Sequence, residues 1–470
     1  MPCPKSTFAL FIGNRGFFSS SMLSESLLRL KKALTNTGFK VITPDYSQFP
    51  KPAIEKPKDG EAFAEFLRIN QGKFDGIILS LPNFGDETGA VAALKSCRVP
   101  ILIHAFPDEL DQMNMNNRRD AFCGKFAIMN LFTQYKIPYT IMTPHVVAPE
   151  SEKFLKNIKC FDKVCKIYQG MRNINIGAFG ARTTPFKAVR YDELTLQRNG
   201  ISVETFDLSD IFSKIKTLDT SNKNFISKSE SLKNYCRWDS VPDKAFINMV
   251  KLGLVIDDYI KEYELNALAL RCWDEIQREL GISPCVLISE LNERGIAAAC
   301  ELDVSSAVAM QALNLASDFP AACFDWNNNY GEDSDKCILF HCGPAPRSML
   351  KGEGVITEHK ILSKTLPECT TYGCLTGRLK SSPVSCCGMM TIDGKLTFYL
   401  LEGEITSDTL PDDFFGCAGV VKINDLQQRL LKLGQNGFRH HTALTQGHVS
   451  EAVREVFKTY LNFSLINFQS

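Results

Sequence analysis

The sequence predicts an α/β protein with two Rossmann-like, doubly wound parallel-sheet domains followed by a β-rich C-terminal domain. Three observations predict this. Short apolar runs alternate with longer amphipathic stretches over residues 1–168, and the alternation restarts and continues over residues 169–345. Residues 346–470 instead combine frequent glycine and proline with segments of alternating polarity. Continuous apolar strands between helices are typical of parallel sheets covered on both faces, whereas alternation is typical of antiparallel sheets.

The elements follow in order along the chain. In the first domain we expect strands at 7–14, 38–44, 75–81, 99–105 and 138–143, and helices at 23–34 and 122–135. In the second domain we expect strands at 174–180, 201–208, 266–273, 284–289, 297–301, 321–325 and 337–343, and helices at 186–198, 243–262 and 303–317. The polar, Lys- and Ser-rich stretch 214–240 predicts an exposed connection with little core of its own. The third domain is expected to contain an alternating strand at 395–406 and a closing amphipathic helix at 449–460.

Composition excludes several classes of function. Lys plus Arg and Asp plus Glu both number 53, so the formal net charge is zero, unlike the basic excess of a dedicated nucleic-acid binder. We find no apolar run near the roughly 18 residues that span a bilayer, and the first residues lack the features of a signal peptide. The 17 cysteines include no C-x-x-C pair, and several lie in apolar segments. We therefore expect a cytoplasmic protein in a reducing compartment, without nucleic-acid or membrane partners.

Two carboxylates end successive predicted strands of the second domain. Glu301 ends the run AAACE, and Asp325 ends the run AACFD. Because a helix is predicted between them, the strands should lie close together and direct both carboxylates into one cleft at the carboxyl edge of the sheet. Paired buried carboxylates are costly unless they share a proton or a cation, and oxygen ligands with an imidazole suit Mn²⁺ and related cations. The candidate imidazoles are those of His341, His440 and His441.

Other interpretations stay open at this point. A strand-terminal Glu or Asp is often only a helix cap or an ion-pair partner. Two α/β domains around a cleft also describe a sugar-binding protein without catalysis, which would need no metal. The same carboxylates and cation would suit a metal-dependent sugar epimerase or aldolase. An NAD-dependent oxidoreductase is disfavoured, because Gly13 and Gly16 do not form a G-x-G-x-x-G motif after the first strand.

Several sequence blocks together carry a more specific resemblance. They are GNRGFF (13–18), RDAFCGK (119–125), GARTTPF (180–186), RCWDEIQ (271–277), SELNERGIAAACELDV (289–304), DWNNNY (325–330) and GFRHHTAL (437–444). With these blocks the chain resembles the L-fucose isomerase and L-arabinose isomerase superfamily, in particular its short fucose-isomerase-like branch, which includes sulfoquinovose isomerases.

The resemblance implies a metal-dependent aldose–ketose isomerase with the architecture predicted above. It implies that Glu301, Asp325 and His441 bind Mn²⁺, with other divalent cations also compatible, and it favours His441 over His440. It leaves His341 as an additional candidate ligand. It also implies a homo-oligomer, typically a hexamer, in which Arg15 contributes to the site of a neighbouring subunit.

The expected reaction moves a proton between C1 and C2 of a monosaccharide through an enediolate. Glu301 and Asp325 would act as acid and base besides binding the cation, and which of them serves the carbon is left open. The residues expected to orient the sugar are Arg15, Gln277, Asn327, Tyr372 and His440. The sugar itself is left open between a fucose- or arabinose-like substrate and a 6-deoxy-6-sulfo sugar. Arg15, Arg182 and Arg190 are the candidate partners of a sulfonate.

Overall fold

The computed structural model describes residues 4–114 and 117–468, which fold into two compact units. The first unit comprises Met1–Gln169 and Glu451–Asn462, and the second comprises Gly170–Ser450 and Phe463–Ser470. Over the described ranges, no helix combines the length and the apolar character that crossing a membrane requires.

The first unit contains a four-stranded, fully parallel sheet with the strand order β2-β1-β3-β4. Its strands are β1 (Thr7–Ile12), β2 (Lys40–Ile42), β3 (Gly76–Leu81) and β4 (Ile101–Ala105), and its helices are α1 (Leu23–Asn36), α2 (Pro57–Ile69), α3 (Glu87–Leu94), α4 (Ala121–Gln134) and α5 (Glu152–Gly170). Every residue of β3 and β4 is buried, as the continuous apolar runs predicted. The fifth predicted strand was wrong, because residues 138–143 form only an isolated bridge between Thr140 and Leu102.

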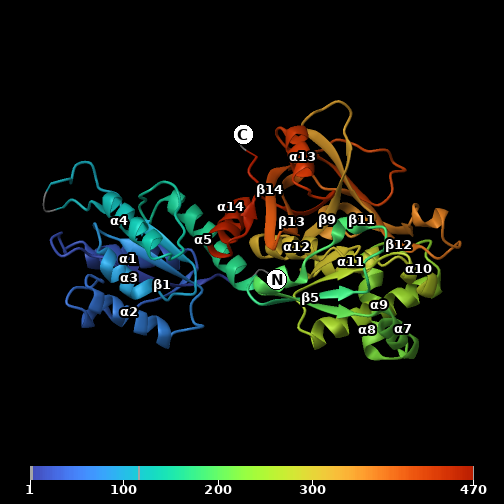
Figure 1. Ribbon diagram of the computed structural model, residues 1–470, viewed down its shortest axis with the longest axis horizontal. Helices are drawn as coiled ribbons and strands as arrows, with labels where there is room; N and C mark the ends of the chain where they lie inside the picture. The colour runs from blue at the N-terminus through green and yellow to red at the C-terminus, as the bar shows by residue number, and fades with distance from the viewer. Residues whose placement is uncertain (1–3, 115–116, 469–470) are drawn as a thin grey trace. The chain divides into compact units, whose positions relative to one another are not determined.

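The end of the chain returns to this first unit. Helix α14 (Ser450–Glu455) continues as a π-helical turn (Val456–Tyr460), where an amphipathic helix was predicted, and it lies beside α5 in Figure 1. The Tyr460 hydroxyl is 2.9 Å from the Thr140 hydroxyl.

The second unit contains another four-stranded parallel sheet, with the strand order β6-β5-β7-β8. Its strands are β5 (Ile174–Phe179), β6 (Ile201–Phe206), β7 (Ala267–Leu270) and β8 (Ala297–Cys300). Its helices are α6 (Glu193–Arg198), α7 (Leu208–Thr217), α8 (Lys223–Tyr235), α9 (Asp243–Glu262), α10 (Glu275–Leu280), α11 (Cys285–Glu293) and α12 (Val304–Ala316). The loops that follow β5, β7 and β8 share the carboxyl edge of this sheet, where α/β proteins usually bind ligands.

Two predictions for this region were wrong. Residues 284–289 were expected to form a strand, but they lie in helix α11, whose residues 285–292 are all buried. A segment buried on all sides shows no amphipathic period, so its sequence does not distinguish a helix from a strand. Residues 214–240 were expected to be an exposed connection, but most of them lie in α7 and α8, and Phe225 and Leu232 are buried.

The rest of the second unit is a nine-stranded, mostly antiparallel sheet with the order β11-β12-β15-β10-β9-β16-β13-β14-β17. An additional pairing of β14 with β15 gives it a barrel-like curvature. Its elements are β9 (Ala321–Asn329), β10 (Lys336–His341), β11 (Leu350–Glu358), β12 (Tyr372–Leu379), β13 (Ser382–Ile392), β14 (Lys395–Ile405), β15 (Cys417–Lys422), α13 (Leu426–Gln435), β16 (His441–Gln446) and β17 (Ser464–Leu465). The mixture of parallel sheets and a β-rich C-terminal part confirms the α/β and β-rich parts of the predicted fold class, and the Rossmann-like detail stays a prediction.

One detail of strand membership differs from the prediction. The segments 321–325 and 337–343 do contain strands, but β9 and β10 pair antiparallel with each other and belong to the large sheet. Asp325 therefore lies within β9 and not at the carboxyl end of a parallel strand. It lies near His441, because the pairing of β9 with β16 places the two residues opposite each other.

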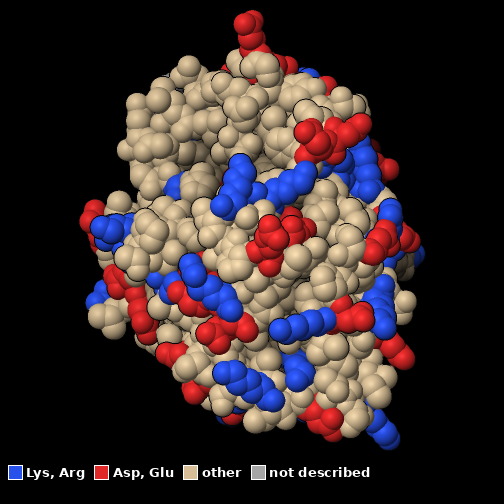
Figure 2. Space-filling model, turned by 90° about the vertical axis from the view of Figure 1, so that its right-hand side faces the viewer, with Lys and Arg blue, Asp and Glu red and all other residues tan. Residues whose placement is uncertain are grey.

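On the face drawn in Figure 2, basic and acidic side chains of the described residues lie interspersed. This mixture matches the balanced charge of the sequence. On that face the charges do not form the single-signed stripe expected of a nucleic-acid-binding surface.

Candidate metal centre

The loop after β8 presents Glu301 in a strained backbone conformation. Glu301 and Leu302 have φ angles of 61° and 62°, in the left-handed region that non-glycine residues rarely adopt. Such residues cost on the order of 1–3 kcal/mol each and are concentrated at functional sites. Backbone hydrogen bonds from Leu302 to Leu270 (3.2 Å) and from Asp303 to Cys300 (3.0 Å) hold the turn.

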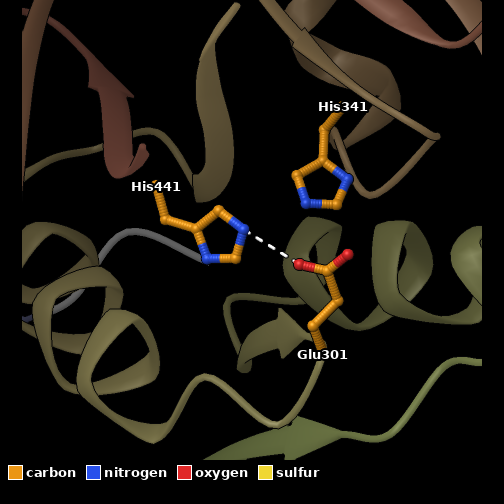
Figure 3. A group of neighbouring side chains, drawn as sticks. All are labelled: Glu301, His341 and His441. Carbon is orange, nitrogen blue, oxygen red and sulfur yellow. Dashed lines mark ion pairs between the residues drawn. The ribbon is translucent and has the colours of Figure 1, made fainter. Parts of the chain in front are cut away.

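The register of β16 against β9 brings His441 opposite Asp325. The Nε2 atom of His441 is 2.9 Å from Oε2 of Glu301 and 3.5 Å from Oδ1 of Asp325. His341 ends β10, and its ring centre is 5.8 Å from that of His441. Figure 3 shows both imidazole rings directed toward the Glu301 carboxylate from different elements. The three predicted cation ligands are thus brought together by the loop after β8 and by two strands of the large sheet.

Three polar atoms of this cluster are buried without a hydrogen-bond partner among the described residues. They are Nε2 of His441, Nε2 of His341 and Oδ1 of Asp325. Buried polar atoms nearly always have a partner, and leaving one unpaired costs roughly 1–3 kcal/mol. Donor atoms of Glu301, His341 and His441, and likewise of Asp325, His440 and His441, lie within 4.8 Å of one another. Unpaired carboxylate and imidazole atoms that converge in this way fit a divalent cation.

The electrostatics of the cluster favour an ionised Glu301. Burial alone would raise the pKa of Glu301, but the neighbouring imidazole of His441 outweighs burial and the pKa is lowered. Burial would lower the pKa of His441, yet the hydrogen bond to Asp303 and the charge of the nearby Glu301 carboxylate raise it to about 10. Without a cation, His441 therefore carries a proton at neutral pH. A cation in the same place would displace that proton.

Burial and neighbouring groups shift the pKa of His341 in opposite directions. Burial lowers its pKa, whereas Cys342 and Asp325 raise it, to about 9. However, a hydrogen bond with Cys285 and burial hold the pKa of the Cys342 thiol well above its usual value, so this thiol carries no charge at neutral pH to raise the pKa of His341. In addition, Nδ1 of His341 accepts the backbone N–H of Cys342 at 2.9 Å, which requires Nδ1 to be unprotonated. We therefore take His341 as neutral with its proton on Nε2, a hydrogen-bond donor directed into the cluster.

Aromatic side chains border the cluster at the carboxyl edge of the parallel sheet. The indole Nε1 of Trp273, in the loop after β7, donates a hydrogen bond of 3.2 Å to Oε1 of Glu301. The ring of Phe186, from the loop after β5, is 6.2 Å from Trp273 and 5.7 Å from both His440 and His441. A cavity of about 310 Å³ at the ends of β5 and β6 is lined by residues that include Arg182, Arg190 and Leu302.

Three of the residues predicted to orient the sugar, His440, Asn327 and Tyr372, lie in different environments. His440 is 46% exposed, and its Nε2 is 3.8 Å from Oδ1 of Asp325, so it borders the cluster. Asn327 is exposed on β9 at a bulge, two residues beyond Asp325. Tyr372 begins β12 and is half-buried, with its carbonyl accepting the N–H of Ser283.

Gln277 and Arg15 are engaged in local structure. Gln277 is fully buried, and its amide nitrogen donates to the carbonyl of Cys272 at 2.7 Å. Arg15 lies in the first unit after β1, where it donates to the carbonyl of Gly85 and forms an ion pair with Glu87. Their roles toward a sugar stay predictions.

Sequence reasoning missed two residues that support the cluster. Asp303 was expected only to begin a helix, but its carboxylate also contacts His441. Arg439 is two residues before His441 and pairs with Asp303. In the sequence Asp303 is two positions after Glu301, and Arg439 directly precedes the histidine pair. The two residues are 136 positions apart, however, and they meet only in the folded chain.

Comparisons with known proteins match most of this chain. Residues 9–172 match the family model "Fucose/sulfoquinovose isomerase, N-terminal domain", and residues 339–469 match "L-fucose isomerase, C-terminal domain". The chain is 22% identical to a sulfoquinovose isomerase of Alkalicoccus urumqiensis over 415 residues, covering 87% of this chain and 89% of the relative. It is 21% identical to the sulfoquinovose isomerase of Priestia aryabhattai over 412 residues, covering 87% and 88%. A sulfoquinovose isomerase of Clostridium sp. (strain MSTE9) is 25% identical over 207 residues, covering 44% and 46%.

Proposed function

We propose that this chain, which belongs to the fucose isomerase-like family and is an aldose–ketose isomerase, works with a divalent cation held by Glu301, Asp325 and His441. One observation carries the proposal of a cation. Carboxylate and imidazole atoms of metal-ligating type converge, and three of them are buried without a hydrogen-bond partner in the part of the chain that the structure describes. Mn²⁺ is the cation to test first, because mixed oxygen and imidazole ligands suit it.

The chemistry that such a cation supplies when bound is Lewis-acid polarisation of a carbonyl oxygen and stabilisation of the negative charge that develops there. The chain's own residues supply the proton transfers. Glu301 and Asp325 present carboxylates to the bound sugar, so one takes the proton from carbon while the other serves the sugar oxygens. His341 donates its Nε2–H to a sugar oxygen, and Trp273 keeps Oε1 of Glu301 in a fixed orientation.

The substrate that we propose is an aldose with a sulfonate at C6. The support comes from the relatives, since the proteins matched along most of this chain are sulfoquinovose isomerases. A sulfonate binds best to guanidinium groups or to several N–H donors. Arg182 and Arg190 line the cavity at the carboxyl ends of β5 and β6, next to Leu302 and hence one residue from Glu301. They are the first residues of this unit to test for a role in sulfonate binding.

The test is a panel of aldoses that includes sulfoquinovose, L-fucose and L-arabinose, incubated with purified protein and Mn²⁺. We expect sulfoquinovose to be converted to its ketose, with conversion abolished by EDTA and restored by added Mn²⁺. Conversion that is unaffected by exhaustive chelation would contradict the cation. Conversion of L-fucose but not of sulfoquinovose would contradict the substrate class.

The same panel tests the rival activities. An epimerase would return a second aldose, an aldolase would return cleaved products, and a sugar-binding protein would return the sugar unchanged. The homo-oligomer and the cytoplasmic location stay predictions, and light scattering of the purified protein measures the subunit number.

A further inference from the structure

We propose that Asp303, anchored by Arg439, is a positioning residue that fixes the proton of His441 on Nδ1 and so leaves Nε2 free to bind the cation. This assignment rests on the proposed function and deepens it. Asp303 is fully buried, and its Oδ2 is 2.7 Å from Nδ1 of His441. Asp303 is two residues after Glu301, so a single short loop supplies one proposed ligand and orients another.

The hydrogen-bond pattern around Asp303 defines the direction of the contact with His441. Oδ1 accepts from the Ser306 N–H (2.9 Å) and from Arg439 (2.5 Å). Oδ2 accepts from the Ser306 hydroxyl (2.7 Å), from Nε of Arg439 (2.6 Å) and from His441. A carboxylate held by so many donors can only accept, so Nδ1 of His441 must be the donor. An imidazole that donates through Nδ1 has its Nε2 lone pair available for a metal.

Arg439 holds the Asp303 carboxylate in the orientation that this arrangement needs. The Arg439 side chain is only 6% exposed, and its guanidinium group contacts both oxygens of Asp303. A third nitrogen, Nη1, donates to the carbonyl of Met389 at 2.8 Å, which ties the pair to β13. A buried charge pair with this bidentate geometry is rigid, so the carboxylate cannot turn away from His441. Because Arg439 and His441 are two residues apart, the same segment carries both the anchor and the oriented ring.

Asp303 also caps helix α12, which is the competing structural role. The two roles can be separated, because Asn caps a helix about as well as Asp does. Asp303→Asn would therefore preserve a capping function. It would remove the charge that pairs with Arg439 and place an amide where His441 needs an acceptor. Asp207, which caps α7 through Ser209, offers the same substitution at a capping site without a histidine contact.

The experiment is Mn²⁺ binding to the full-length protein, followed by the electron paramagnetic resonance of free Mn²⁺, with thermal melting of the same samples in EDTA. We expect Asp303→Asn to weaken Mn²⁺ binding by roughly 10- to 100-fold, the usual effect of losing a carboxylate that orients a metal-bound histidine. Asp207→Asn should bind Mn²⁺ as the wild type does. Equal affinities of Asp303→Asn and wild type would overturn the positioning role and leave the proposed function standing. A wild type that binds no Mn²⁺ would overturn both.

A second measurement on the wild type does not depend on how any Asp303 variant folds. The protein is labelled with ¹⁵N-histidine and loaded with diamagnetic Mg²⁺, and the His441 signals are assigned by their loss in His441→Gln. Long-range proton–nitrogen spectra then show which ring nitrogen of His441 carries the proton. A proton on Nδ1 supports the assignment, and a proton on Nε2 overturns it.

Discussion

Binding of the cation should release one proton, and raising the pH should strengthen the binding. The proton comes from His441, whose pKa is raised to about 10 in the cation-free protein and which must be deprotonated at Nε2 to act as a ligand. Between about pH 6 and pH 8 the cation-free His441 stays protonated, so each pH unit should lower the Kd for Mn²⁺ about tenfold, or ~1.4 kcal/mol. Over this window the gain is about 100-fold, or ~2.7 kcal/mol.

The direction of this pH dependence follows from whether the cation-free or the cation-bound protein holds the proton. The cation-free protein holds it and the loaded protein does not, so acid favours the cation-free state and weakens binding. Glu301 contributes no further proton in this window, because its pKa is already lowered below its usual value near 4.5. His341 contributes none either, since its Nδ1 accepts the Cys342 N–H and its ring is taken as neutral.

The assay is calorimetric titration with Mn²⁺ at fixed pH in two buffers that differ in protonation enthalpy, which counts the protons released. We expect a count close to one for the wild type and the same count for His341→Ala. A count near zero with tight binding would refute the assignment of His441 as a ligand. A count near two that falls to one in His341→Ala would show that His341 also gives up a proton and is a ligand.

Three further outcomes are expected. Glu301→Gln should retain the fold and lower turnover by about 100-fold or more, because it removes an acid–base group and a ligand charge together; a loss below about tenfold with Mn²⁺ still bound would exclude this role. In EDTA, the contribution of His441 to stability is fully present below about pH 6.5, its unfolded-state pKa, and is lost as the pH rises through about 10. Thermal melts should therefore show the cation-free protein losing stability from about pH 7 to pH 10, and a melting temperature equally steep in His441→Gln would contradict this cause. Trp273→Phe should weaken Mn²⁺ binding by up to about tenfold, because it removes the Nε1 hydrogen bond to Glu301. The control Trp238→Phe removes an indole hydrogen bond to the Leu232 carbonyl and should leave Mn²⁺ binding unchanged. Equal effects of the two substitutions would argue against the Trp273 contact.

The sequence was informative about the fold where segments were either fully buried or clearly periodic. The runs that became β1, β3, β4 and β5 are continuously apolar and short, which is typical of strands in a parallel sheet. The sequence did not show which strands pair when they are far apart along the chain. Residues 321–325 were identified as a strand, yet their place in the large sheet depends on β10 and β16, which nothing local to that segment encodes.

The carboxylates of the site could be found from the sequence, but the reason they meet could not. Glu301 does follow a strand of the parallel sheet, as predicted. Asp325 reaches the same cluster through the cross-strand pairing of β9 with β16, and not through a neighbouring parallel strand. The preference for His441 over His440 came from the family resemblance. Its physical basis, the contact of His441 with Asp303, exists only after the chain has folded.

The central claim is that Glu301, Asp325 and His441 together hold the divalent cation of this isomerase. Crystals of the full-length protein soaked in Mn²⁺, with diffraction recorded at the manganese absorption edge, test it most directly. We expect an anomalous peak within bonding distance of His441 Nε2 and of a carboxylate oxygen from each of Glu301 and Asp325. A peak bound elsewhere in the protein, with these three side chains free of metal, would contradict it.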